Sequence, residues 1–367
     1  MKRKKTKQYR LSFPHMGNYH ITFKTFFKAL DLEIVIPPPI SKQTIELGSR
    51  YSPESVCVPF KYNLGNYIQA LDRGANLLLQ AGGGCRYGYY GEAQKHILEN
   101  LGYDFEFFKL RNKRNPINII GDIHKINPKI PFYRVLKAFL LAYFKGRCIE
   151  KAEDFLRKNI GFEKKKGQLE KQFKFFLSKL DQAETFTQAR QLTKKYLRIF
   201  ENIPILKPKN LLRVGVVGEF YVVLEPFSNY NIEKFLASKG VEVHRFITLT
   251  GLLNHSIFNG IIPNHEVNQY LRHAKPFLKY HIGGHGTDSV GKANELAKKG
   301  FDGAIHIKPF GCIPEVNAMP ALQNISKKYN FPIIYLSFDA QTSDTGMQTR
   351  LEAFYDMLTM KKNATKK

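Results

Sequence analysis

The sequence predicts an α/β protein of two Rossmann-like lobes with parallel sheets, joined by a basic helical insertion. Three observations favour this fold. Short apolar runs alternate with helix-like segments at both ends of the chain, a central stretch changes to a helical apolar period, and 367 residues exceed what one ordinary core accommodates. The expected divisions are a basic tail at 1–8, a first lobe at 9–128, the insertion at 129–208 and a second lobe at 209–367.

The first lobe begins with a predicted strand, and its elements then alternate. The proline run 37–39 ends the second strand, because proline removes a ladder donor and fixes φ. Gly74 closes the helix that precedes the third strand. The strands are expected at 9–13, 32–36, 77–80 and 105–108, and the helices at 21–29, 66–72 and 91–100.

The central stretch 131–202 carries apolar residues three and four positions apart among many lysines, which is typical of amphipathic helices. We interpret these stripes as packing faces rather than as a cofactor site, and we expect Cys148 to pack among them. The stripe residues include Phe132, Val135, Leu136, Phe139, Leu140, Tyr143, Phe173, Phe176, Leu177 and Leu180.

The second lobe repeats the alternation. Gly215 and Gly218 form a fragment of a dinucleotide fingerprint, but the full glycine spacing is missing and a nucleotide site there is not favoured. The apolar run 276–280 leads into a His-Gly loop around His285. A strand that runs into a loop is expected at 211–221, further strands at 241–246 and 303–307, and helices at 232–239 and 289–299.

Three of the four cysteines, Cys57, Cys85 and Cys312, lie on loops that precede helices. Cys85 and Cys312 each follow an apolar run. Cys57 stands 28 residues before Cys85, and the position 28 residues before Cys312 is Gly284, next to His285. The second half therefore has its His-Gly loop where the first half has Cys57. If the halves face each other, three thiolates converge in one cleft. Three thiolates suit an iron-sulfur cluster or zinc and leave one metal position open. The simpler alternative is that these cysteines are small structural residues.

The charge is strongly positive, with 57 basic and 31 acidic residues and a net charge of +26. Much of the excess lies in the first seven residues and over about 144–213, and it favours an anionic partner such as nucleic acid, an acidic electron carrier or a phosphate-bearing ligand. A lysine-rich solvated surface is the simpler interpretation, and no nucleic-acid module is recognisable. Without a signal peptide or a long apolar run, we expect a cytoplasmic protein with reduced thiols and no membrane span.

Four separated stretches resemble the 2-hydroxyacyl-CoA dehydratase / benzoyl-CoA reductase-like superfamily, in the branch labelled CoA protein activase or coenzyme A enzyme activase-like protein. They are residues 51–61, 83–92, 308–315 and 349–354. The resemblance implies an oxygen-sensitive 4Fe-4S cluster between the lobes, held by Cys57, Cys85 and Cys312, in an anaerobic electron-transfer protein. Because the chain has only four cysteines, one cubane per chain is a better fit than a double-cubane cluster.

The resemblance also implies a function and partners. The chain would accept low-potential electrons from an ATP-hydrolysing activator that has its own iron-sulfur cluster. It would act as a subunit of an ATP-dependent low-potential reductase or 2-hydroxyacyl-CoA dehydratase, on a CoA thioester or other small molecule, in a homodimer or with a related subunit. The alternative is a non-catalytic scaffold whose basic helical region holds an acidic partner.

Three further residues are candidates for a role beside the cluster. His285 could supply a ligand or a proton at the open iron, although ordinary backbone hydrogen bonds are the simpler expectation. Glu315 and Arg86 flank predicted cluster ligands and are candidates for tuning the potential or contacting substrate. The sequence contains no P-loop, so ATP hydrolysis by this chain itself is not expected.

Overall fold

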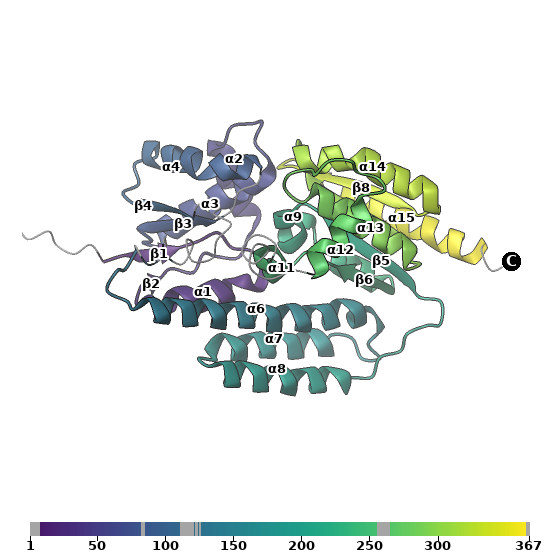
Figure 1. The fold of residues 1–367 in the computed structure, drawn as a ribbon, viewed down its shortest axis with the longest axis horizontal. Coiled ribbons are helices and arrows are strands. Elements are labelled where there is room, and N and C mark those ends of the chain that lie inside the picture. The colour runs from purple at the N-terminus through teal and green to yellow at the C-terminus, as the bar shows by residue number, and fades with distance from the viewer. Residues whose placement is uncertain are drawn as a thin grey trace, which may run out of the picture.

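The computed structural model describes residues 8–81, 85–110, 121, 124, 126–254 and 265–364. Two α/β lobes lie side by side above a layer of three long helices (Figure 1). Each lobe contains one four-stranded sheet in which all strand pairs are parallel. The predicted fold class is therefore confirmed. Within the described residues, no helix is long and apolar enough to cross a membrane.

The first lobe has the strand order β2-β1-β3-β4. Its strands are β1 (Arg10–Ser12), β2 (Glu33–Ile34), β3 (Leu77–Ala81) and β4 (Glu106–Leu110), and its helices are η1 (Gly17–Tyr19), α1 (His20–Lys28), α2 (Lys42–Tyr51), α3 (Val58–Asp72), η2 (Arg86–Tyr89) and α4 (Tyr90–Asn100). The helix predicted at 66–72 begins eight residues earlier, because Cys57 is its N-cap and Pro59 stands in its first turn. Helix α2 was not predicted. Ser41 and Thr44 form the capping box that starts it.

Helices α2 and α3 cross so closely that both need glycine at the contact. A Cβ atom added to Gly48 would lie 1.7 Å from the carbonyl oxygen of Lys61, and one added to Gly65 would lie 1.9 Å from that of Thr44. Both obstacles are backbone atoms, which cannot rotate away. This contact fixes α3, and with it the Cys57 loop at the start of that helix.

We therefore expect Gly48→Ala to lower the free energy of unfolding by about 1–3 kcal/mol, because the two helices must separate. The measurement is chemical unfolding followed by circular dichroism. Gly346→Ala is the matched control, since this glycine lies in the helix α15 (Asp344–Ala364) with its nearest obstacle at 3.9 Å. Equal stability of the two variants would contradict the close-packing argument.

The helical layer consists of α6 (Phe132–Asn159), α7 (Gln168–Gln182) and α8 (Phe186–Glu201). Helix α6 runs beneath both lobes and packs on α1 of the first and on β6 (Val241–Arg245) of the second (Figure 1). Cys148 is buried with residues such as Phe176, Leu180 and Phe200, so its predicted packing role is confirmed.

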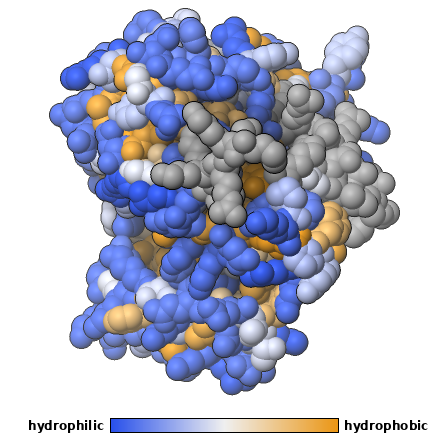
Figure 2. Space-filling model, turned by 90° about the vertical axis from the view of Figure 1, so that its left-hand side faces the viewer, coloured by the Kyte–Doolittle hydropathy of each residue, from blue (hydrophilic) through white to orange (hydrophobic). Residues whose placement is uncertain are grey.

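The predicted apolar stripe of α6 is only partly correct. Val135 is buried, but Phe132, Leu136 and Leu140 are exposed. The buried face instead contains Val135 with the small residues Ala138 and Ala142, which let α1 approach α6 closely. Figure 2 views the end of the molecule formed by the first lobe and shows a mainly hydrophilic surface with small, separate hydrophobic patches. Isolated exposed apolar residues of this kind are common in folded proteins.

The second lobe has the strand order β6-β5-β7-β8, which repeats the order of the first lobe. Its remaining strands are β5 (Leu212–Gly218), β7 (Gly303–Pro309) and β8 (Ile333–Phe338), and its other helices are α9 (Phe220–Leu224), η4 (Phe227–Asn229), α10 (Ile232–Ser238), α11 (Leu249–Leu253), α12 (His265–Ala274), α13 (Gly286–Lys298) and α14 (Ile313–Tyr329). Strand β3 therefore corresponds to β7, and the preceding helix α3 corresponds to α13.

A single hydrophobic cluster joins the two lobes. Val58 and Tyr62 of α3 belong to the same cluster as Tyr221 of α9, and the two tyrosine rings stack with centroids 6.0 Å apart. The carboxylate of Glu225 accepts a hydrogen bond from the backbone N–H of Gly17 at 2.7 Å. The segments that enter this junction therefore have fixed relative positions, including the start of α3 and the end of β5.

Candidate functional site

The three predicted site cysteines occupy equivalent local positions, each at the N-cap of a helix. Cys57 caps α3, Cys85 caps η2 after β3, and Cys312 caps α14 after β7. Backbone N–H groups at a helix start favour negative charge, but burial opposes a thiolate at all three positions. At Cys85 the sulfur accepts a hydrogen bond from the N–H of Tyr87 at 3.4 Å.

The charge of Cys57 interacts with that of Cys85 and with that of Cys312. Burial raises the pKa of Cys57 to about 12, and charge on Cys85 contributes to that rise. Burial likewise raises the pKa of Cys312, with contributions from Glu219 and Cys57, and it raises the pKa of Cys85 with a contribution from Glu219. Cys57 of the first lobe and Cys312 of the second lobe are therefore close enough for their charges to interact. Within the part of the chain that the structure describes, no three His, Cys, Asp or Glu side chains are placed to hold a single metal ion.

Glu219 is the central carboxylate of this site, and the sequence analysis did not identify it. It follows β5, caps α9 and accepts hydrogen bonds from the N–H groups of Tyr221 and Val222 at 3.0 and 2.9 Å. Burial raises the pKa of Glu219, the charge of Glu315 adds to the rise, and the two N–H groups and His285 oppose it. An acidic residue directly after a buried strand was the available sequence signal.

His285 lies where the chain-order repeat predicted. It is the N-cap of α13, as Cys57 is the N-cap of the corresponding helix α3. Its ring stacks on Phe220 at 5.5 Å, and its Nδ1 lies 3.1 Å from Asp288 Oδ2, so its partner is a side chain and not the backbone. Burial lowers the pKa of His285, but the hydrogen bond and charge of Asp288, with Glu315 and Glu219, raise it above its ordinary value. The three carboxylates thus favour the protonated form of the imidazole.

The other two candidate residues differ in position. Glu315 is buried, and its Oε2 accepts hydrogen bonds from Ser289 Oγ at 2.9 Å and from His306 Nε2 at 2.8 Å. It belongs to an internal network of the second lobe and acts on Cys312 through its charge, which contributes to raising the pKa of that thiol. Arg86 is exposed at the first position of η2.

Two tyrosines complete the first-lobe side of the site. Tyr90 Oη lies 2.7 Å from Cys57 Sγ, and the rings of Tyr87 and Tyr90 are 5.2 Å apart. Tyr87 Oη accepts a hydrogen bond from Asn63 Nδ2 of α3 at 2.8 Å. The dense aromatic and glycine content after Cys85 therefore forms one wall of the cysteine site.

Together, these observations define a two-lobed α/β protein in which both lobes have cysteines at the N-termini of helices. Residues 14–79, which run from the loop after β1 into β3 and include Cys57, match the CoA enzyme activase uncharacterised domain. This match confirms the predicted resemblance to the CoA enzyme activase-like branch of the 2-hydroxyacyl-CoA dehydratase-related superfamily. Comparison with curated proteins gives no match.

Proposed function

We propose that this chain holds one 4Fe-4S cluster through Cys57, Cys85 and Cys312 and accepts low-potential electrons from an ATP-hydrolysing activator. One observation carries the proposal. Thiols from both lobes lie within electrostatic reach of one another and of Glu219 at the starts of three helices. Cysteine thiolates are the usual ligands of iron-sulfur clusters. Three protein ligands would leave one iron free for a small-molecule substrate such as a CoA thioester.

The donor set fits such a cluster chemically. Burial and Glu219 raise the pKa of each thiol, so without a bound cation these sulfurs hold their protons. Cys57, Cys85 and Cys312 would hold the iron as thiolates in place of those protons, and the positive charge of the iron would offset the cost of bringing thiolates close to Glu219. The cluster would supply one-electron reduction. His285 would hold a proton beside it, while Tyr90 would orient Cys57.

The first experiment is an iron and acid-labile sulfide analysis of protein purified under strict anaerobic conditions. We expect about four of each per chain, and an EPR signal of a cubane after dithionite reduction. Twice that content with coupled spins would contradict the single-cubane proposal and indicate a double-cubane cluster. No iron after reconstitution would refute the cluster altogether.

The alternative function, a non-catalytic scaffold that holds an acidic partner through its basic helical region, predicts a different result. The cluster would be absent, and the chain would bind an acidic protein with an affinity that falls steeply with salt. Colour and iron content separate the two proposals before any partner is known. The proposed activator and the pairing with a second subunit would then be tested with the iron-loaded protein.

A further inference from the structure

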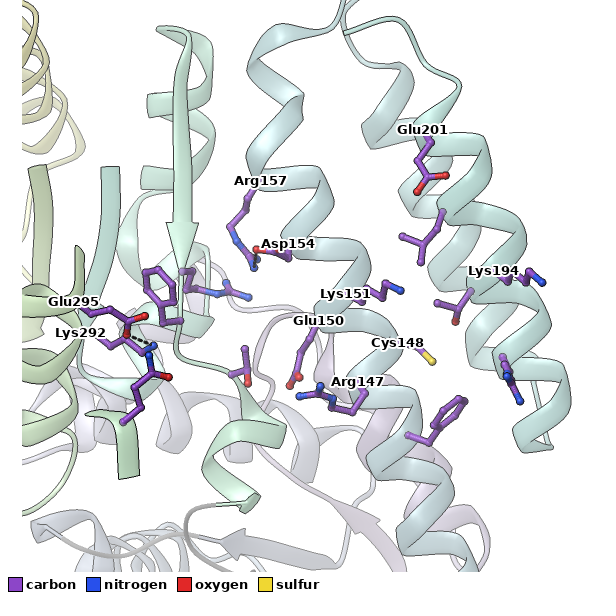
Figure 3. Close-up of a pocket in the computed structure, with 18 of the residues that line it drawn as sticks. Arg147, Cys148, Glu150, Lys151, Asp154, Arg157, Lys194, Glu201, Lys292 and Glu295 are labelled. Atoms are coloured by element: carbon purple, nitrogen blue, oxygen red, sulfur yellow. Dashed lines mark hydrogen bonds and ion pairs between the residues drawn. The ribbon is translucent and has the colours of Figure 1, made fainter. Parts of the chain in front are cut away.

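A groove outside the cysteine site lies between the helical layer and the second lobe. Its volume is 960 Å³. Residues of α6 line it between α8 on one side and the second lobe on the other (Figure 3). The cluster proposal makes no use of this groove, so its properties can be considered independently.

Five exposed cations line the groove from the helical layer. Arg147 and Lys151 stand one turn apart on α6, and Arg190, Lys194 and Arg198 occupy three successive turns of α8. In Figure 3 Lys151 extends from α6 toward α8, while Arg147 projects from the other side of α6. None of the five forms an ion pair with another residue that the structure describes. Like charges one turn apart destabilise a helix, and a bound anion would relieve that repulsion.

The cations of the opposite wall already have acidic partners. Arg245 pairs with Glu153 at 2.5 Å, and Lys292 pairs with Glu295 at 2.9 Å, as the dashed lines of Figure 3 mark for the second pair. Lys299 also pairs with Glu295, at 2.5 Å. Among the described residues that line the groove, the cations without an ion pair therefore lie on α6 and α8.

The acidic residues of the groove leave this charge in excess. Glu150 accepts hydrogen bonds from Thr250 and Tyr19 and is close enough to Arg147 for their charges to interact, and Asp154 accepts a hydrogen bond from Lys158 at 2.6 Å. Glu201 lies at the end of α8, beyond the row of cations. A ligand with several negative charges fits this arrangement better than a singly charged one.

We propose that this groove binds an oligophosphate. Guanidinium groups match phosphate oxygens in geometry, and three of the five free cations are arginines. The groove is recessed and its volume lies within the range of small-molecule sites, which favours a compact polyanion over a protein surface. Phe144, Leu197 and Phe246 also line it and would contact an organic group attached to the phosphates.

The test is titration calorimetry of the full chain with inorganic tripolyphosphate and with ATP. We expect Arg190→Gln/Lys194→Gln/Arg198→Gln to weaken tripolyphosphate binding by about tenfold or more, because charge-assisted bonds to phosphate are lost. A second variant, Arg147→Gln/Lys151→Gln, should weaken it as well. Tighter binding of ATP than of tripolyphosphate would assign an organic oligophosphate, and equal binding an inorganic one.

A matched control separates a site from general attraction to a basic protein. Lys164→Gln/Lys165→Gln/Lys171→Gln removes the same charge from exposed positions outside the groove and should change the affinity less than about twofold. Equal losses in this control and in the α8 variant would overturn the proposal. Absence of binding to the unaltered chain would also overturn it. Tighter binding of a polyglutamate peptide than of tripolyphosphate in the groove would overturn it too, and would assign an acidic polypeptide as the ligand.

Discussion

A chain in which Cys312 is replaced by alanine is expected to keep less than about a tenth of the iron of the unaltered protein. Cys312 is the only proposed ligand from the second lobe, so its loss leaves two first-lobe thiols to hold a cluster between the lobes. We expect the same loss for Cys57→Ala and Cys85→Ala. Iron and sulfide content after anaerobic reconstitution is the measurement.

Cys148→Ala provides the matched control for these variants. Cys148 is buried in the core of the helical layer and makes no part of the inter-lobe site, so this variant should keep full iron content. Full iron in the Cys312 variant would remove that residue from the ligand set. Equal iron loss in the Cys148 variant would show that the assay follows folding and not ligation.

The strands and helices around the cysteine loops could be predicted because alternation is a local pattern, whereas α2, β8 and the start of α3 could not. Helix α3 is buried on nearly all sides, including Lys61, Asn63 and Asn66, so it has no polar face and no clear apolar period. Only the last part of this helix, which Gly74 follows, has a sequence pattern that predicts a helix and its end. The close crossing at Gly48 and Gly65 depends on tertiary packing that neither segment shows alone.

The candidate site shows the same division between local and long-range information. The three cysteines could be found from their positions on loops before helices, and His285 could be found by counting back from Cys312. Glu219 could not, because many strands end at an acidic residue. Its importance arises only when the end of β5 faces thiols from both lobes.

Replacement of Glu153 by glutamine is expected to lower the free energy of unfolding by about 3–5 kcal/mol. Glu153 of α6 binds Arg245 of β6 at 2.5 Å and Asn18 of the first lobe at 2.7 Å, and it lies 3.5 Å from Arg157. Glutamine leaves two buried guanidinium groups without this shared carboxylate. Glu233, 3.3 Å from Arg245, compensates in part and places the effect at the lower end of the range.

The pH dependence distinguishes a charge effect from simple loss of packing. Burial raises the pKa of Glu153, but Arg245 and Arg157 together hold it below the ordinary value of 4.5. A carboxylate with a lowered pKa stabilises the fold above its unfolded pKa and loses that contribution as pH falls through the folded one. The difference in urea midpoint between wild type and Glu153→Gln should therefore be largest near neutral pH and shrink below about 4.5.

Glu352→Gln removes an exposed pair with Lys239 and should change stability by less than about 1 kcal/mol at any pH. If the difference in urea midpoint caused by Glu153→Gln were equally large in acid, packing of the side chain, and not its charge, would stabilise the contact between the helical layer and the second lobe.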